Sequence, residues 1–293
     1  MKSSIDNDLP FISIVIPTLN RKKSLEACLN SLLELDYPKS RFEIVVVDGG
    51  SSDGTDEMLR RNYENIRMVI DRREGISYAR NAGWKVSRGE ITVFTDDDCI
   101  IEKSWLKKLL TGFYSNKIAA VGGPVVLLNP EIFPVKFVES LTLGTFSLNS
   151  NQSETRLLIT ANLAVKRKIF EIAKFDVAFG RRKTLMYRWE EDVEFCERLL
   201  SLGYKLAYVP TAKVYHNVDP KRLGIKYVIT KEFSGGLSHY MVERKHYKRI
   251  TIGINSLRSL AGAFLHFYRN RSIASFCWLI KMNAMVLASI FIA

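Results

Sequence analysis

The chain has 293 residues, of which 47% are hydrophobic and 25% are charged, and its formal net charge is +12. This composition excludes a disordered chain and a collagen-like chain, and the length allows one large α/β domain with an appendage. Four widely separated cysteines, without CxxC or zinc-site spacing, indicate reduced thiols in a cytosolic compartment rather than a disulfide framework. We expect no signal peptide in the polar residues 1–10.

The first half of the chain alternates short apolar runs with helical patterns. Residues 11–17 are rich in β-branched side chains, which predicts a buried strand, and Asn20 is placed to cap the helix that follows. Alternating strands and helices imply a parallel sheet with helices on both faces. The further predicted elements are strand 42–47, a helix from Thr55, strand 67–70, helix 76–86, strand 91–95, helix 104–114 and strand 119–121.

The second half is less regular. Residues 129–156 show no clear pattern, and we expect an insertion there. Ligands of a parallel sheet bind beyond the carboxyl ends of its strands, and polar clusters follow Ile16, Val47 and Thr95, so we expect a site at this edge. The remaining predicted elements are strand 159–165, helix 166–173, a helix 189–202 that ends at Gly203, and strand 205–209.

The last quarter of the chain is basic and apolar. From Asp219 onward there are 12 Lys and Arg residues against 3 acidic residues. The accompanying apolar runs, 250–268 and 272–293, favour an anionic membrane surface over nucleic acid, because the aromatic-studded stretches that stack bases are missing. Lys281 and Asn283 oppose a lipid-facing span. We expect an interfacial first helix and a second that spans or lies shallow; buried helices of a soluble domain or an oligomer interface remain the alternative.

Two acidic clusters carry the chemistry. Asp96, Asp97 and Asp98 close the predicted strand 91–95, where neighbouring carboxylates repel one another unless a cation joins them. Oxygen ligands at this spacing suit Mg²⁺ or Mn²⁺, which commonly also bind a substrate's phosphates. A second cluster, 190–192, opens the predicted helix 189–202. One acidic site for a metal and another for a proton is the arrangement of a group-transfer enzyme.

Taken in order, the motifs resemble those of family 2 glycosyltransferases. The resemblance covers roughly residues 10–217 and implies a GT-A fold (a Rossmann-like, mostly parallel sheet), a nucleotide-diphosphate sugar donor, with UDP expected first, and inversion at the anomeric carbon. It divides the chain into a catalytic domain, 1–217, with a nucleotide-sugar half at about 10–125 and an acceptor half at 126–217, and a membrane-associated helical region, 218–293. The motifs are PTLN at 17–20, VVVDGGSSDGT at 45–55, GISYARNAG at 75–83, TDDD at 95–98, Asn162, Glu191-Asp192 and His216.

The resemblance implies a donor pocket at the strand ends. Asp48 is expected to accept the imide N–H of a uracil or thymine ring, although an aspartate before two glycines can instead stabilise a turn, as we expect of Asp53. Arg80 would steady the diphosphate or the acidic cluster through charge-assisted hydrogen bonds. The other expected donor-side residues are Pro17, Thr18, Asn20, Gly50, Asn81 and Asp97.

The implied metal is Mn²⁺ or Mg²⁺, acting as a Lewis acid on the departing nucleotide. Asp98 would bind the ion directly, and Asp96 would contact the ribose and the waters of the metal. His216 would close the metal shell or touch the diphosphate, with a structural role as the alternative. Trp189 would shape the acceptor or donor-sugar pocket. No QxxRW motif follows the second acidic cluster, which argues against a processive synthase.

Asp192 would be the general base that removes the proton of an acceptor hydroxyl. Glu191, its neighbour, is the second expected catalytic acid, and as a first-turn residue it could instead favour the helix dipole. Glu190 leaves the register ambiguous, and the match to the glutamate–aspartate pair of the family selects Asp192. A structural role for both acids, at the start of a helix, is the alternative.

These expectations combine into a membrane-associated enzyme with a cytoplasmic catalytic domain. It would transfer one sugar to a hydroxyl of a lipid-linked or surface glycan. Three alternatives stay open: transfer to a polyprenyl phosphate, nucleotidyl transfer to a sugar phosphate, and a non-catalytic membrane module that binds nucleotide sugars. Nucleotidyl transfer is disfavoured because no glycine-rich, lysine-bearing phosphate loop follows the first strand.

Overall fold

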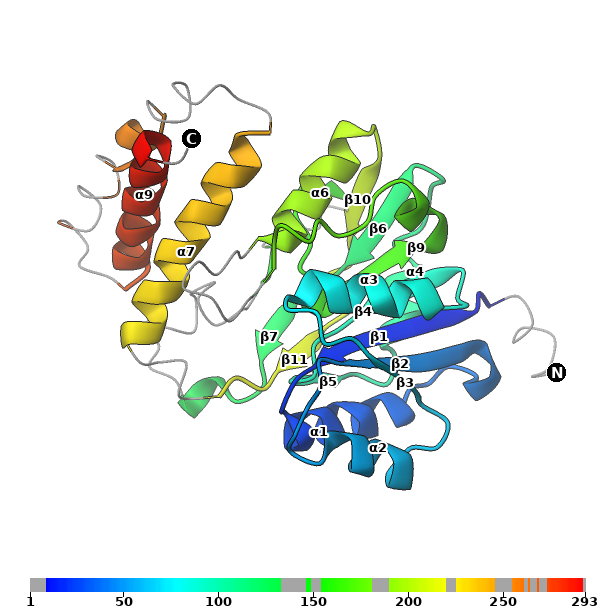
Figure 1. Cartoon of the computed structure of the whole chain (residues 1–293). Coiled ribbons are helices and arrows are strands. Elements are labelled where there is room, and N and C mark those ends of the chain that lie inside the picture. The colour runs from blue at the N-terminus through cyan, green and yellow to red at the C-terminus, as the bar shows by residue number, and fades with distance from the viewer. Residues whose placement is uncertain are drawn as a thin grey trace.

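A computed structural model describes residues 9–132, 146–148, 154–180, 190–219, 225–245, 255–260, 263, 268 and 273–291. Its centre is an eight-stranded sheet in the order β3-β2-β1-β4-β9-β6-β10-β8 (Figure 1). The strands are β1 (Ile12–Thr18), β2 (Phe42–Asp48), β3 (Arg67–Ile70), β4 (Ile91–Phe94), β6 (Ile118–Gly122), β8 (Glu154–Thr155), β9 (Leu163–Lys166) and β10 (Lys205–Tyr208).

The sheet is mixed rather than purely parallel. β1, β2, β3 and β4 pair in parallel, as predicted, and so do β6 and β10. β9 runs antiparallel between β4 and β6, and β8 is antiparallel to β10. The sheet is therefore mostly parallel, as expected, and the direction of the two antiparallel strands could not be read from the sequence, because a short apolar run has the same pattern in either direction.

Helices cover both faces of the first four strands. α1 (Lys22–Leu33) and α2 (Thr55–Asn62) lie on one face, and α3 (Ile76–Val86) lies on the other (Figure 1). α4 (Trp105–Leu110) is shorter than the predicted helix 104–114, and the predicted helix 166–173 is a 3₁₀ segment, Arg167–Glu171. α6 (Glu191–Ser201) is followed by Gly203 with φ of +82°, as the predicted helix end requires.

A second, three-stranded sheet was not predicted. It has the order β5-β11-β7, formed by β5 (Cys99–Ile101), β11 (Val214–His216) and β7 (Val125–Leu127). Strands of three residues are too short to show an alternating pattern in the sequence. The antiparallel pairing of β11 with β5 places His216 opposite Cys99, directly after the acidic run.

Two long helices form a separate layer beside the sheet. α7 (Ile225–Glu243) was not predicted, whereas α9 (Ile273–Phe291) falls within the predicted run 272–293. They touch backbone to backbone, since a Cβ on Gly236 would lie 2.2 Å from the carbonyl oxygen of Lys281. Within the described part of the chain, no helix combines the length and the apolar character needed to cross a bilayer. The runs 250–268 and 129–156 lie largely outside the described residues.

Candidate active site

The carboxylates of the first acidic cluster gather at the carboxyl edge of the sheet, as predicted. The Thr18 hydroxyl donates to Asp97 at 2.7 Å, which ties the end of β1 to the residues after β4. The Arg21 guanidinium bonds Asp97 at 3.0 Å and Asp98 at 2.7 Å. Arg21 is a site residue that the sequence reading missed. Its position just after the first strand was the available signal, because every polar cluster of interest follows a strand end.

Asp97 and Asp98 are both buried, and the pKa of Asp97 is strongly shifted. Burial raises the pKa of Asp97 to about 7, with the nearby Asp98 acting in the same direction and Arg21 opposing it. Arg21 therefore compensates only part of the burial and mutual repulsion that act on Asp97. The cluster is a site at which an additional cation would be stabilised.

The donor set fits a hard divalent ion. Asp98 Oδ2 lies 3.1 Å from His216 Nε2. An octahedral ion with bonds of about 2.1 Å holds neighbouring ligand atoms about 3 Å apart, so these two atoms are spaced as two ligands of one metal. Asp96 accepts a hydrogen bond from Arg80 at 3.2 Å. Among the described residues, no three acidic, histidine or cysteine side chains already surround one point, so the full ligand set stays a prediction.

Arg80 joins the two acidic clusters. It projects from α3, is only 1% exposed, and donates to Glu191 Oε1 at 2.6 Å as well as to Asp96. Its guanidinium also lies over the Phe175 ring, 5.7 Å from the centroid. Of the two roles predicted for Arg80, the geometry shows the steadying of the acidic clusters.

Asp192, in the second acidic cluster, also has a pKa that suits proton transfer near neutral pH. Burial raises its pKa to about 7, Glu191 adds to the rise, and Arg80 opposes it. Its Oδ1 accepts only a neighbouring backbone N–H, from Val193 at 3.0 Å, among the contacts described here. A carboxylate with a pKa close to the working pH is an effective general base. The catalytic role of Asp192 remains a prediction with this support.

The expected base pocket is built around a tight turn. Asp48 accepts hydrogen bonds from the Ser51 backbone at 3.0 Å and from the Ser51 hydroxyl at 2.6 Å, so the turn-stabilising alternative is realised. Asn20 does not cap α1: it has φ of +53°, and its side chain accepts the Ser52 N–H at 2.7 Å. The helix instead begins after Arg21, which has no capping hydrogen bond. Gly50 has φ of +91°, which the turn requires.

Other candidate residues have structural partners. Both ends of the Asn81 amide bond the Phe175 backbone, at 2.8 and 3.0 Å. Asn162 is buried and donates to the carbonyl oxygens of Pro124 and Ala212. Their side chains position the loops that surround the site. Asp53 accepts a local hydrogen bond from Thr55, as predicted. Pro17 lies in β1 opposite Val47. Trp189 lies outside the described residues.

Comparisons with known proteins identify relatives of this chain. The chain is 29% identical over 250 residues to the glycosyltransferase AglE of Haloferax volcanii, covering 83% of this chain and 78% of that protein. It is 26% identical over 245 residues to the glucosyl-dolichyl phosphate glucuronosyltransferase of the same organism, covering 79% and 77%.

A solved structure shares the fold. The mannosyltransferase PcManGT from Pyrobaculum calidifontis, in complex with GDP-Man and Mn²⁺, matches with a TM-score of 0.62 and 20% identity, covering 97% of this chain and 72% of that one. The fold is therefore GT-A-like, as expected. The model of the family described as Glycosyl transferase family 2 matches residues 13–172, more than half of the chain. The chain belongs to glycosyltransferase family 2.

Proposed function

We propose that this enzyme transfers a sugar, with inversion, from a nucleotide-diphosphate sugar to a hydroxyl group of a lipid-linked glycan. The observation that carries the proposal is the buried Arg80, which bonds both Asp96 and Glu191. The first carboxylate belongs to the cluster suited to a metal and a diphosphate. The second is adjacent to Asp192, whose raised pKa suits a base. In this proposal, one guanidinium links the carboxylates that serve donor binding and proton removal.

The two acidic clusters have different roles in the proposed reaction. Asp192 takes the proton of the acceptor hydroxyl while the hydroxyl oxygen bonds to the anomeric carbon, and the bond to the nucleoside diphosphate breaks on the opposite face. Asp48, with Thr18 and Asn20, would contact the base and the ribose. Asp98, His216 and Asp96 would hold Mn²⁺ or Mg²⁺, which would stabilise the charge that develops on the leaving diphosphate.

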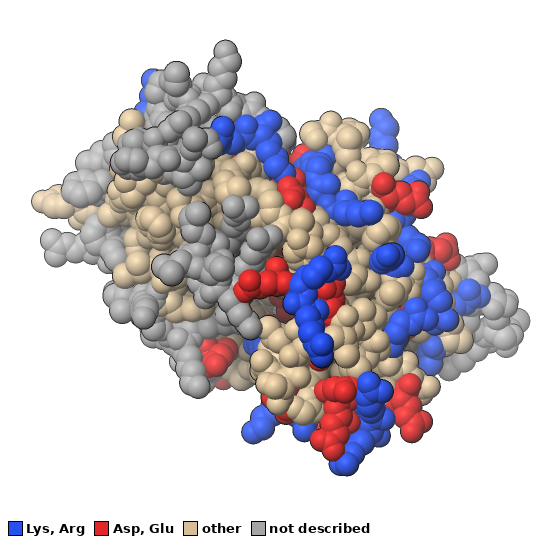
Figure 2. All heavy atoms as spheres, viewed as in Figure 1, with Lys and Arg blue, Asp and Glu red and all other residues tan. Residues whose placement is uncertain are grey.

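The lipid-linked acceptor is supported by two observations. One relative is named for action on a dolichyl phosphate derivative. Large apolar side chains are exposed on α7 and α9, among them Phe233 at 39% and Trp278 at 39%. In Figure 2 the described atoms at this end of the molecule are mostly tan, whereas charged side chains crowd the catalytic part. We place the helical region on the membrane surface, with the catalytic domain in the cytoplasm.

The first experiment is calorimetric titration of UDP, GDP and dTDP into detergent-solubilised protein, with and without Mn²⁺. We expect one nucleotide to bind in a metal-dependent manner. Asp98→Ala should abolish the metal dependence, and Asp56→Ala, an exposed acid of α2, should leave it unchanged. Absence of binding by all three nucleotides would contradict the proposal.

The Asp192→Asn variant tests whether the acceptor group is a hydroxyl or a phosphate. A polyprenyl phosphate is already ionised and needs little help from a base, whereas a sugar hydroxyl does. Loss of transfer to a glucosyl polyprenyl phosphate would support the hydroxyl acceptor. Normal transfer by this variant to an unsubstituted polyprenyl phosphate would favour the phosphate acceptor instead.

A further inference from the structure

The start of α6 is attached to the C-terminal helices by Glu190. Its carboxylate bonds His239 Nδ1 of α7 at 2.8 Å, and it also bonds Nζ of Lys281 in α9. The side chain of Glu190 is 11% exposed. Although burial raises the pKa of Glu190, Lys281 and His239 outweigh this effect and the pKa is lowered, so the group is held as a carboxylate. The ionised state of this buried carboxylate therefore depends on α7 and α9, which lie beyond the residues 13–172 that the family model matches.

The backbone of Glu190 has an unusual conformation. Its φ is +72°, and among the described residues Asn20 is the only other non-glycine residue with positive φ. A glutamate in this region is strained unless its surroundings hold it. The carbonyl oxygen of Glu190 accepts the Glu194 N–H at 3.0 Å, which forms the first turn of α6. The conformation of Glu190 therefore sets the direction in which α6 begins, and Asp192 lies in that first turn.

The ion pair with Glu190 explains why a lysine stands at position 281. Lys281 stands in the middle of an apolar helix, where a charge is costly without a partner. Its ammonium group reaches across to Glu190, at the start of α6. The contact at Gly236 brings the α7 backbone against the Lys281 carbonyl, so α7 and α9 present His239 and Lys281 together.

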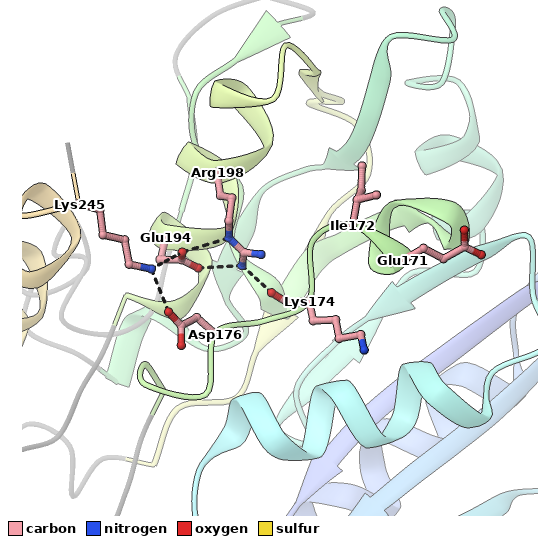
Figure 3. Close-up of a pocket in the computed structure, with 7 residues that line it drawn as sticks. All are labelled: Glu171, Ile172, Lys174, Asp176, Glu194, Arg198 and Lys245. Atoms are coloured by element: carbon pink, nitrogen blue, oxygen red, sulfur yellow. Dashed lines mark hydrogen bonds and ion pairs between the residues drawn. The ribbon is translucent and has the colours of Figure 1, made fainter.

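A second attachment lies one turn further along α6. Figure 3 shows Lys245, just beyond α7, reaching between Glu194 and Asp176 at 2.6 and 2.9 Å. Arg198 also bonds Glu194, at 2.9 Å. These groups border a cavity of about 390 Å³. At this point α6 is already a regular helix. The ion pairs of Lys245 therefore join the C-terminal helices to the catalytic domain without setting the backbone conformation at the start of α6.

We propose that Glu190 is a positioning residue through which α7 and α9 orient the catalytic base at the start of α6. This proposal rests on the proposed role of Asp192 as the general base. By holding the Glu190 carboxylate from two helices, the C-terminal layer fixes a strained backbone that is two residues from the base. Removing either partner lets the first turn of α6 relax and moves Asp192 relative to the acceptor hydroxyl.

The test compares two lysines of the same layer in the full-length enzyme. Lys281→Met should lower kcat about ten- to a hundredfold, the loss that small misplacement of a catalytic group causes, while nucleotide affinity stays unchanged. It should also speed amide hydrogen exchange at the start of α6. Lys281→Arg should restore kcat. Lys245→Met, the matched control, should lower the melting temperature but leave kcat unchanged.

A double variant separates positioning from stability. Glu190→Gly combined with Lys281→Met removes the buried charge pair and suits φ of +72°, so it should fold well and still be slow. Wild-type kcat in this variant, or an equal loss of kcat in Lys245→Met, would overturn the proposal. Full activity of Asp192→Asn would instead refute the proposed function itself, so the two failures are distinguishable.

Discussion

The raised pKa of Asp192 makes a quantitative prediction for the dependence of transfer on pH. A base with a pKa of about 7 is ionised in about 9% of molecules at pH 6 and in about 91% at pH 8. If Asp192 removes the acceptor proton, kcat/KM should rise about tenfold between these two pH values, with a midpoint near 7. With an ordinary aspartate pKa of 3.8, the profile would be flat over this range.

The same shift has an opposite effect on stability. Between pH 3.8 and about 7 the folded Asp192 binds a proton that the unfolded chain has already released. Folding is therefore favoured by protonation in this window, and the free energy of unfolding falls as the pH rises through it. Asp192→Asn removes this dependence. The variant should be inactive and yet, at pH 8, at least as stable as the parent.

The assay is nucleotide release from the donor that calorimetry identifies, measured at several pH values beside thermal unfolding. Glu197→Gln is the matched control, since it removes one negative charge from the same helix at a partly exposed position paired with Arg156. It should keep both the pH profile and the activity. A flat profile between pH 6 and pH 8, or an active Asp192→Asn enzyme, would refute the assignment of Asp192 as the base.

Three further predictions follow from contacts of the site and the core. Asp98→Ala should abolish Mn²⁺-dependent nucleotide binding while circular dichroism shows an intact fold, and EDTA should have the same effect on the parent. Arg80→Met leaves the Glu191 carboxylate buried without its partner, so urea denaturation should show a free energy of unfolding lower by about 3–5 kcal/mol, and a value equal to that of the parent would contradict the buried pair. Gly83→Ala places a Cβ 2.3 Å from a valine methyl group of β1, so it should lower stability by about 1–3 kcal/mol, whereas Gly235→Ala, with no neighbour within 4 Å, should not.

The sequence determined the local elements and the identity of the reactive groups. Strand Arg67–Ile70 and helix Ile76–Val86 were predicted with the bounds that they have in the structure, because apolar periodicity depends only on neighbouring residues. The acidic run after β4 was expected at the carboxyl edge of the sheet for a similar reason, since its position follows from the strand that precedes it.

Only the tertiary structure decided which of these groups meet. Arg21 was not singled out from the sequence, and for Arg80 the sequence left the diphosphate and the acidic cluster as alternative partners. The fold places Arg21 on Asp98 and Arg80 between Asp96 and Glu191. Strand directions, the short strand that carries His216, and the contact of Lys281 with Glu190 involve segments far apart in the chain. Local patterns do not encode such pairings, because they depend on how the burial of all elements is satisfied at once. Composition thus determined the chemistry available to the enzyme, and packing determined which charges are neighbours.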